Sequence, residues 1–360
     1  MLLAESSSGS NSTASLITFR RRLSARWASV LLIGLVGVTS TASAEPDPGT
    51  VSQEATKVTY HVVHGWPQLP KGRDLGAVSG VDVDSHGNVF VFHRNDRIWP
   101  ATNILSTEPI SLPTVTVFDG PTGKLVTEWG ANTFAMPHGL TIDAHDNVWL
   151  TDVALQQVYE YSHDGRLLMT LGVRGVAGND STHFNRPTKV AVAPDGSFFV
   201  SDGYRNTRVM KFSSTGKFLF QWGTPGSEPG QFDLPHSVTL DGQGRVYVSD
   251  RSNGRVQIFD STGHFLTQWK TAEIGRPYDV AIAADGSALI ADGGDQPKSP
   301  PDRSGVAIVS PAGTVLARFG RWGNYDGELE MAHDIAMGPA GAVYVGDITG
   351  RRVQKFLPSK

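Results

Sequence analysis

Residues 235–250 read Pro-His-Ser-Val-Thr-Leu-Asp-Gly-Gln-Gly-Arg-Val-Tyr-Val-Ser-Asp, and this stretch decides the fold. Apolar and polar residues alternate on both sides of a glycine-bearing turn, which is the pattern of a β-hairpin. A third alternating run follows at Arg255–Phe259, and a turn leads to a fourth run that ends in an aromatic residue. The stretch therefore predicts four antiparallel strands in roughly 40–55 residues.

The same pattern occurs five more times along the chain. The other copies begin at Val78, Pro137, Pro187, Pro277 and Ala332. A four-stranded unit of this kind buries its two apolar faces only against neighbouring units, so the units must close into a ring. The sequence predicts an all-β, six-bladed β-propeller, and the copies resemble NHL repeats. The stretch 57–63 is expected to supply the outer strand that closes the last blade.

Composition agrees with a large globular β-protein. The chain has 360 residues, 40 glycines and 21 prolines, with 39% apolar residues and a formal charge of −4. These values do not fit a disordered or membrane-spanning chain, and the acidic balance argues against nucleic acid as a partner. There is no cysteine, so a transition-metal site would have to use histidine and carboxylate ligands.

The N-terminus has the features of a secretory signal. Arg20, Arg21, Arg22 and Arg26 precede an apolar run over residues 27–38, and Ala42-Ser-Ala44 forms a cleavage site. We expect a signal peptide over residues 1–44, a linker over 45–56 and one catalytic propeller domain over 57–360. The alternative is an uncleaved anchor, but twelve apolar residues are too few to span a bilayer. The mature protein is expected to be a periplasmic or secreted monomer without stable membrane insertion.

Three histidines, His138, His236 and His333, occupy the second position of alternate repeats, where the innermost strand begins. Their spacings are 98 and 97 residues. Alternate blades of a six-fold ring lie about 120° apart, so the three imidazoles can converge near the axis. Three histidines with an open fourth position form the arrangement of a catalytic zinc site. The alternative is that each Pro-His pair is a turn preference whose ring nitrogens bond locally.

Other polar residues are expected on the same face as the histidines. The second strand of each hairpin ends where the first begins, which places Arg94, Arg251 and Tyr204 near the proposed metal. Met331 precedes His333 by two residues. Arginines and a tyrosine beside a metal suit an anionic substrate and a general base, although salt bridges between blade loops are the alternative. The aspartates that end the second strands are expected to cap turns.

A more specific pattern runs through all six repeats. Its residues are Val78-Ser-Gly-Val81, Phe92-His-Arg-Asn95, Trp99, Pro137-His-Gly-Leu140, Thr151-Asp-Val-Ala-Leu155, Gln157-Val158, Asp202-Gly-Tyr204, Asn206, Arg208, Pro235-His-Ser237, Asp250-Arg251, Asn253-Gly-Arg255, Met331 and His333-Asp334. In this order they resemble the peptidyl-α-hydroxyglycine α-amidating lyase family. The resemblance implies cleavage of the N–Cα bond of a C-terminal α-hydroxyglycine, releasing a peptide amide and glyoxylate.

The resemblance also implies roles for individual residues. It implies that the three histidines bind Zn²⁺ and that Tyr204, Arg94, Arg251 and Met331 surround the substrate. It further implies a structural Ca²⁺ ion held by Asp334 and by the backbone carbonyls of Val81 and Leu140. The chain departs from the animal enzymes in having no cysteine, with Arg205 where one is expected.

Two other functions are compatible with the residues. The first is a non-catalytic NHL propeller that binds a protein or peptide in the periplasm, which needs no stoichiometric zinc. The second is a calcium-dependent propeller hydrolase such as a lactonase, against which the ring of histidines argues, because such enzymes typically use carboxylates.

Overall fold

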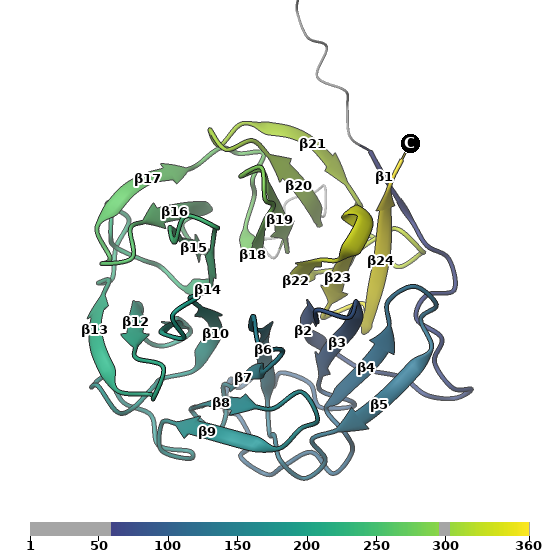
Figure 1. Ribbon diagram of the computed structural model, residues 1–360, viewed down its shortest axis with the longest axis horizontal. Coiled ribbons are helices and arrows are strands. Elements are labelled where there is room, and N and C mark those ends of the chain that lie inside the picture. Colours follow the sequence, from purple (N-terminus) through teal and green to yellow (C-terminus); the bar gives the residue numbers. More distant parts are fainter. Residues whose placement is uncertain (1–58, 295–302, 360) are drawn as a thin grey trace, which may run out of the picture. The chain divides into compact units, whose positions relative to one another are not determined.

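The structure is a computed structural model that describes residues 59–294 and 303–359, all within one compact unit. The described residues form six four-stranded antiparallel sheets arranged as blades around a common axis (Figure 1). The first strand of each repeat lies innermost, and in five blades strands two to four follow outward in chain order, whereas the outermost strand of the sixth blade comes from the start of the described chain. The predicted six-bladed, all-β propeller is therefore confirmed.

The strands have the following bounds. Blade one contains β2 (Val78–Val83), β3 (Asn88–His93), β4 (Val115–Asp119) and β5 (Leu125–Trp129). Blade two contains β6 (Pro137–Ile142), β7 (Val148–Asp152), β8 (Gln157–Tyr161) and β9 (Leu167–Leu171). Blade three contains β10 (Pro187–Val192), β11 (Phe198–Asp202), β12 (Arg208–Phe212) and β13 (Phe218–Trp222). Blade four contains β14 (Pro235–Leu240), β15 (Val246–Asp250), β16 (Arg255–Phe259) and β17 (Phe265–Trp269). Blade five contains β18 (Pro277–Ile282), β19 (Ala288–Asp292), β20 (Gly305–Val309) and β21 (Val315–Phe319). Blade six contains β22 (Ala332–Met337), β23 (Val343–Asp347), β24 (Arg352–Pro358) and β1 (Tyr60–Val62).

The ring closes where the two ends of the propeller meet in blade six. Strand β1 pairs antiparallel with β24, so Val62 lies opposite Phe356. This confirms the predicted closing strand over its described residues. The predicted signal peptide and linker lie outside the described residues, as do residues 295–302.

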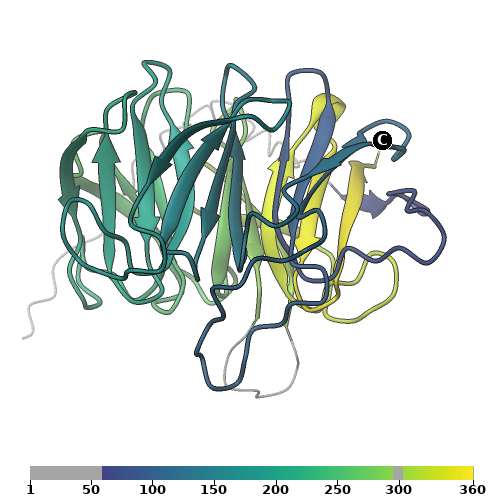
Figure 2. The same cartoon turned by 90° about the horizontal axis from the view of Figure 1, so that it is seen from below.

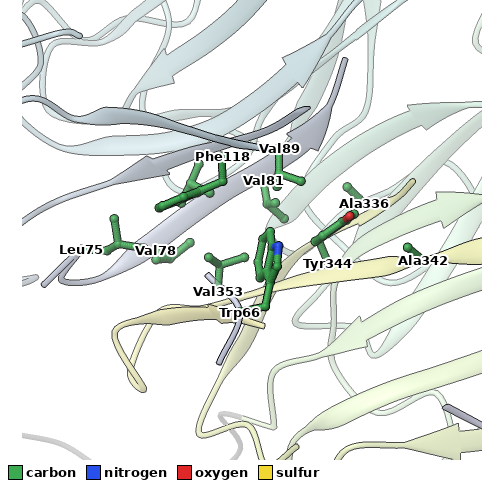
Figure 3. Close-up of a cluster of buried hydrophobic side chains, with 11 residues drawn as sticks. Trp66, Leu75, Val78, Val81, Val89, Phe118, Ala336, Ala342, Tyr344 and Val353 are labelled. Atoms are coloured by element: carbon green, nitrogen blue, oxygen red, sulfur yellow. The ribbon is translucent and has the colours of Figure 1, made fainter. Parts of the chain in front are cut away.

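A cluster of buried side chains seals the seam between blades one and six (Figure 3). Trp66 packs against Tyr344 of blade six and Phe118 of blade one, with ring centroids 4.9 and 6.0 Å apart. Its indole N–H donates to the Gly120 carbonyl at 3.0 Å. Comparable apolar clusters lie between the other blades, as expected for units that can bury their faces only against each other.

Every innermost strand begins with the same irregularity, which places the residues of the site. In blade four, Pro235 pairs with Asp250 and Ser237 pairs with Ser249, so the pairing passes over His236. The register shifts at the same point in the other five blades. A β-bulge of this kind leaves one residue outside the ladder and redirects its side chain.

The described residues contain almost no helix. Their one helical element is the 3₁₀ turn η1 (Pro339–Gly341), and no described helix is long and apolar enough to cross a membrane. Long loops instead extend from the ring, and Figure 2 shows the blue loop between β3 and β4 projecting beyond the strand ends on one face. This loop follows β3, which is antiparallel to β2, so the loop lies on the face of the ring where the innermost strands begin.

Candidate metal centre

The three histidines predicted to meet on the axis do meet there. The ring centroids of His138, His236 and His333 lie 4.8–4.9 Å from one another. One nitrogen of each ring lies within 4.8 Å of the others, and all three side chains are buried. Each histidine is the bulged residue at the start of β6, β14 or β22. The bulge therefore directs all three imidazoles towards the same point.

Backbone carbonyls of the intervening blades fix the orientation of each imidazole. The Nδ1 atoms lie 2.7–2.8 Å from carbonyl oxygens of the next blade, pairing His138 with Thr188, His236 with Tyr278 and His333 with Ser79. A carbonyl can only accept, so each Nδ1 carries the proton and each Nε2 keeps its lone pair. This is the outer-shell arrangement of histidines that bind metal through Nε2.

The three Nε2 atoms face one another, and only two of them have a hydrogen-bonding neighbour among the described residues. The Nε2 atom of His333 is buried and has no hydrogen-bond partner among the described residues. The other two contact one phenol, because Tyr204 Oη lies 3.1 Å from Nε2 of His138 and 3.2 Å from Nε2 of His236. Unpaired buried acceptors are costly, so the geometry fits a metal ion at the convergence point.

Electrostatics keep the three rings neutral. Burial, followed by the positive charge of Arg94, lowers the pKa of His138 to about 3. Burial and the neighbouring histidines hold the pKa values of His236 and His333 well below their ordinary value. Neutral imidazole is the form that binds metal, so the site is prepared for a cation at neutral pH.

Gly139 allows the blade contact on which His138 depends. A Cβ atom at this position would lie 2.2 Å from the Thr188 carbonyl oxygen, which accepts the His138 proton. No side chain fits there, because real Cβ atoms essentially never approach backbone oxygen so closely. The absence of a side chain thus lets β6 approach β10 and brings the histidine to its carbonyl.

The remaining predicted residues gather around the same point. Arg94, Tyr204, Arg251 and Met331 line one cavity of about 560 Å³ together with His333. The cavity lies on the face of the ring where the innermost strands begin. This is the face on which the second strands end, because the two strands of each hairpin are antiparallel. The structure therefore brings the predicted residues together.

The two arginines are held by different contacts. Arg94 is buried, and its Nε donates to the Pro137 carbonyl at 2.8 Å while Nη2 has no hydrogen-bond partner among the described residues. The guanidinium carbon of Arg251 lies 4.1 Å from the ring centroid of Tyr278, a cation–π contact. The Tyr278 hydroxyl in turn contacts the sulfur of Met331 at 3.6 Å.

The loop between β3 and β4 supplies the outer wall of the cavity. Trp99 packs on Tyr204 with ring centroids 5.1 Å apart, and the Arg94 guanidinium carbon lies 5.6 Å from its ring. Ile98 also lines the cavity, as do Leu234 and Ile348 from other loops. Trp99 belongs to the pattern that resembles the lyase family, but no feature of the sequence predicts its contact with Tyr204.

The surroundings of Asp334 do not fit the calcium site that the resemblance implies. Asp334 Oδ1 accepts a hydrogen bond from Lys189 Nζ at 2.5 Å, and Oδ2 accepts one from the Val81 backbone N–H at 3.0 Å. The same ammonium group lies 2.6 Å from Asp279 Oδ2. A cation of this chain therefore already contacts the carboxylate expected to bind calcium, which does not favour a calcium ion at Asp334, while the assignment of Val81 and Leu140 stays a prediction.

Lys189 and Asp279 were missed in the sequence, although a signal was present. The third position of the repeat carries glycine or serine in three blades and Lys189, Asp279 and Asp334 in the others. Opposite charges at equivalent positions of a closed ring can meet at its axis. The charge pattern across repeats could therefore have predicted this contact.

The repeated aspartates have the structural role expected for them. Asp152 is buried, and its two oxygens accept the backbone N–H groups of Ala135, Met136, Ala154 and Leu155. Asp202 likewise binds the Asn185 N–H and the Arg208 side chain. These carboxylates hold the loops that carry the site residues.

A second group of metal-ligand side chains lies away from this centre. Asp84, His86 and His163 are close enough to hold an ion, but both imidazoles are exposed. Asp84 is already bonded by Asn88 and by the backbone N–H of His86. Its carboxylate thus has partners without a metal, unlike the Nε2 atom of His333.

Comparison with known proteins shows the family of the chain. Residues 232–259 match the NHL repeat family. The chain is 33% identical over 312 residues to peptidyl-alpha-hydroxyglycine alpha-amidating lyase 2 of Drosophila melanogaster, covering 82% of this chain and 73% of that protein. The chain belongs to the peptidyl-α-hydroxyglycine α-amidating lyase family. It is therefore a lyase-like enzyme, as its motifs predicted.

Other relatives of the family are much longer than this chain. The chain is 39% identical over 313 residues to peptidyl-glycine alpha-amidating monooxygenase B of Xenopus laevis, and the match covers 82% of this chain and 35% of that protein. The chain thus spans about a third of the length of this amidating relative. Among solved structures, streptogramin B lyase superposes with a TM-score of 0.55 at 13% identity, covering 83% of this chain and 98% of that one, which supports the propeller fold alone.

Proposed function

We propose that this lyase-family chain is a zinc-dependent enzyme that cleaves the N–Cα bond of a peptidyl α-hydroxyglycine, or of a related α-hydroxy amide. The products are an amide and glyoxylate. One observation carries the proposal: three buried imidazoles present Nε2 lone pairs to one point, with each Nδ1 proton held by a carbonyl. Membership of a family named for this activity supports the choice of substrate.

The donor set favours zinc over other cations. Three neutral imidazoles and an open side towards a cavity are typical of catalytic zinc, whereas calcium and magnesium prefer oxygen ligands. His138, His236 and His333 would hold the ion through Nε2. When bound, zinc supplies Lewis acidity towards the hydroxyl and carboxylate oxygens of the substrate.

Tyr204 is placed to carry the proton of the reaction. Its phenol oxygen lies beside two of the Nε2 atoms, so it borders the position of a substrate hydroxyl at this centre. As phenolate, favoured by the neighbouring Arg94, it would accept the hydroxyl proton. The O–H electron pair then forms the C=O bond of glyoxylate while the N–Cα bond breaks. Tyr204 returns the proton to the departing amide nitrogen, so the atoms and charges balance.

Arg94 and Arg251 are placed to hold the substrate carboxylate. Both guanidinium groups line the cavity, and the partnerless Nη2 of Arg94 provides a buried donor for an anion. Arginine binds a carboxylate through two parallel hydrogen bonds, which fixes the plane of the hydroxyglycine. Met331, held by the Tyr278 hydroxyl, would pack against the same end of the substrate.

The cavity also limits what can precede the hydroxyglycine. Ile98, Trp99, Leu234 and Ile348 form an apolar wall within a volume of about 560 Å³. This space exceeds what one hydroxyglycine needs, so the residue before it would contact the apolar wall. We expect the substrate to be a peptide or acyl amide with an apolar group at this position.

The proposal includes export of the protein as a monomer. The sequence of residues 1–44 supports a signal peptide, and the acidic composition supports a partner other than nucleic acid. Fractionation of cells that express the full chain, followed by mass determination of the mature N-terminus, would test cleavage after Ala44. Retention of the full-length chain in the membrane would contradict it.

The test of the lyase activity is direct. Purified protein is supplied with N-benzoyl-α-hydroxyglycine, and glyoxylate and benzamide are measured in equal amounts. His236→Ala and Tyr204→Phe should each lower kcat by at least about 100-fold, because they remove a metal ligand and the proton carrier. His145→Ala, which changes a histidine of the turn between β6 and β7, serves as the matched control.

The result also separates the alternatives. A non-catalytic peptide-binding propeller would release no glyoxylate and would bind the peptide equally well in both variants. Full turnover in both variants would contradict the proposed mechanism.

A further inference from the structure

A group of three charged side chains follows the bulged position in three of the six repeats. Lys189, Asp279 and Asp334 occupy the third position of blades three, five and six, directly after the bulged residue. All three are buried, and they line a small space together with the three histidines. Charges from three separate blades therefore meet near the axis of the propeller.

The contacts among these side chains are short and involve several blades. Lys189 Nζ donates to Asp279 Oδ2 at 2.6 Å and to Asp334 Oδ1 at 2.5 Å. Asp334 Oδ2 accepts the Val81 backbone N–H of blade one at 3.0 Å. Asp279 Oδ2 and Asp334 Oδ1 also accept the Ile335 N–H at 3.2 and 3.1 Å. One ammonium ion thus links blade three to blades five and six, and through Asp334 to blade one.

We infer that the Lys189 ammonium is the resident cation of the propeller axis and takes the place of the structural calcium ion that the family resemblance implies. A divalent cation bound to Asp334 would lie beside the ammonium and would be repelled by it. The ammonium binds one oxygen of each buried carboxylate, as a metal could, but it is part of the chain; among the described residues Asp279 Oδ1 has no hydrogen-bond partner. The innermost strands are therefore held together without calcium.

Removal of the lysine has a specific consequence. Two buried carboxylates would then face each other across the vacated space, and their repulsion would destabilise the fold. Carboxylate and carbonyl oxygens are the ligands that calcium prefers, so the vacated space would acquire affinity for calcium. The substitution should convert a calcium-independent propeller into one that calcium stabilises.

Thermal unfolding of the full chain tests this inference, with calcium chloride and the chelator EGTA as probes. The melting temperature of the wild type should be the same in both. That of Lys189→Ala should be lower in EGTA and should rise by roughly 5 °C in millimolar calcium. Lys189→Gln, which keeps a neutral N–H donor on a side chain one bond shorter, gives a second variant if the alanine form does not fold, and its melting temperature should also rise in calcium.

Lys355→Ala is the matched control. Lys355 is also buried, but its ammonium donates to the Gly120 carbonyl at 2.7 Å. Its loss should lower the melting temperature without creating a response to calcium. A wild type that calcium stabilises and EGTA destabilises would overturn the inference, as would a Lys189→Ala protein with unchanged stability in EGTA. Neither result depends on glyoxylate release, so the lyase proposal is tested separately.

Discussion

At the scale of single residues, the site depends on how each imidazole is oriented rather than on histidine alone. Each Nδ1 proton is held by the carbonyl of the next blade, and those carbonyls belong to Ser79, Thr188 and Tyr278. The histidine positions were predictable from spacing because equivalent positions of a ring face its axis. The carbonyl partners were not predictable, because every residue has a backbone carbonyl and the sequence does not show which one faces an imidazole.

Gly139 should be as important to metal binding as a ligand. Gly139→Ala places a Cβ atom against the Thr188 carbonyl and should separate it from His138. Loss of such an outer-shell partner typically costs about 10–100-fold in metal affinity. Competition between the protein and a zinc chelator would measure the change. Gly242→Ala is the control, since a Cβ there meets nothing within 4 Å, and equal affinities in both variants would contradict this account.

His93 predicts a pH dependence of stability that is separate from the metal ligands. It is fully buried beside Thr116, and burial lowers its pKa to about 4. The unfolded chain therefore binds this proton more readily, so the stability contribution is complete above about pH 6.5 and is lost as the pH falls towards 4. The free energy of unfolding should fall by about 3 kcal/mol over this window.

Urea titrations at several pH values would show the effect of His93. In His93→Gln, the slope between pH 6.5 and 4 should be smaller than in the wild type, because the titrating group is gone. The same variant should lose some stability at pH 8 through its altered packing. A slope identical to that of the wild type would show that His93 does not titrate in this window.

At the scale of elements, the innermost strands and the loops beside them build the site. Alternation with a period of two predicted the strands, but it also predicts that the residue after Pro235 pairs with the neighbouring strand. The structure instead has a bulge there in every blade. The bulge places residues of both the second and the third position at the axis, which explains why the contact of Lys189 was not predicted.

The loop between β3 and β4 is expected to set both rate and substrate preference. Trp99 supports Tyr204 and forms part of the apolar wall of the cavity. Trp99→Ala should lower kcat/KM by about 10–100-fold for substrates with phenylalanine before the hydroxyglycine, and by less for those with aspartate. Steady-state kinetics on the two substrates would measure this. Ile104→Ala, exposed on the same loop, is the control, and an equal loss on both substrates would contradict a role in selectivity.

At the scale of the whole molecule, the metal site depends on closure of the ring. His333 of blade six bonds to Ser79 of blade one, so this contact crosses the seam where the ring closes. Trp66 and the cluster in Figure 3 seal that seam. The closed ring was predictable from six repeats, because open blades would expose apolar faces. Most of the seam cluster comes from strands of the repeats, but Trp66 and Leu75 precede the first repeat and were not predictable from its pattern.

Trp66→Ala should therefore weaken the fold and the site together. Truncation of a buried aromatic side chain costs roughly 3–5 kcal/mol, and the loss should appear in denaturant unfolding. Zinc affinity should also fall, since His333 and Ser79 would no longer be held in register. Trp322→Ala, at a tryptophan that is 50% exposed, is the control and should change neither quantity appreciably. Normal stability of Trp66→Ala would show that the seam is held by other contacts.

The most direct test of the metal centre is the zinc content of the purified protein after extensive dialysis, measured by elemental analysis. We predict one zinc ion per wild-type chain and close to none in His236→Ala, whose fold is checked by circular dichroism. A wild type that retains no zinc, or a His236→Ala protein that retains as much as the wild type, would contradict the proposal that these three imidazoles share one ion.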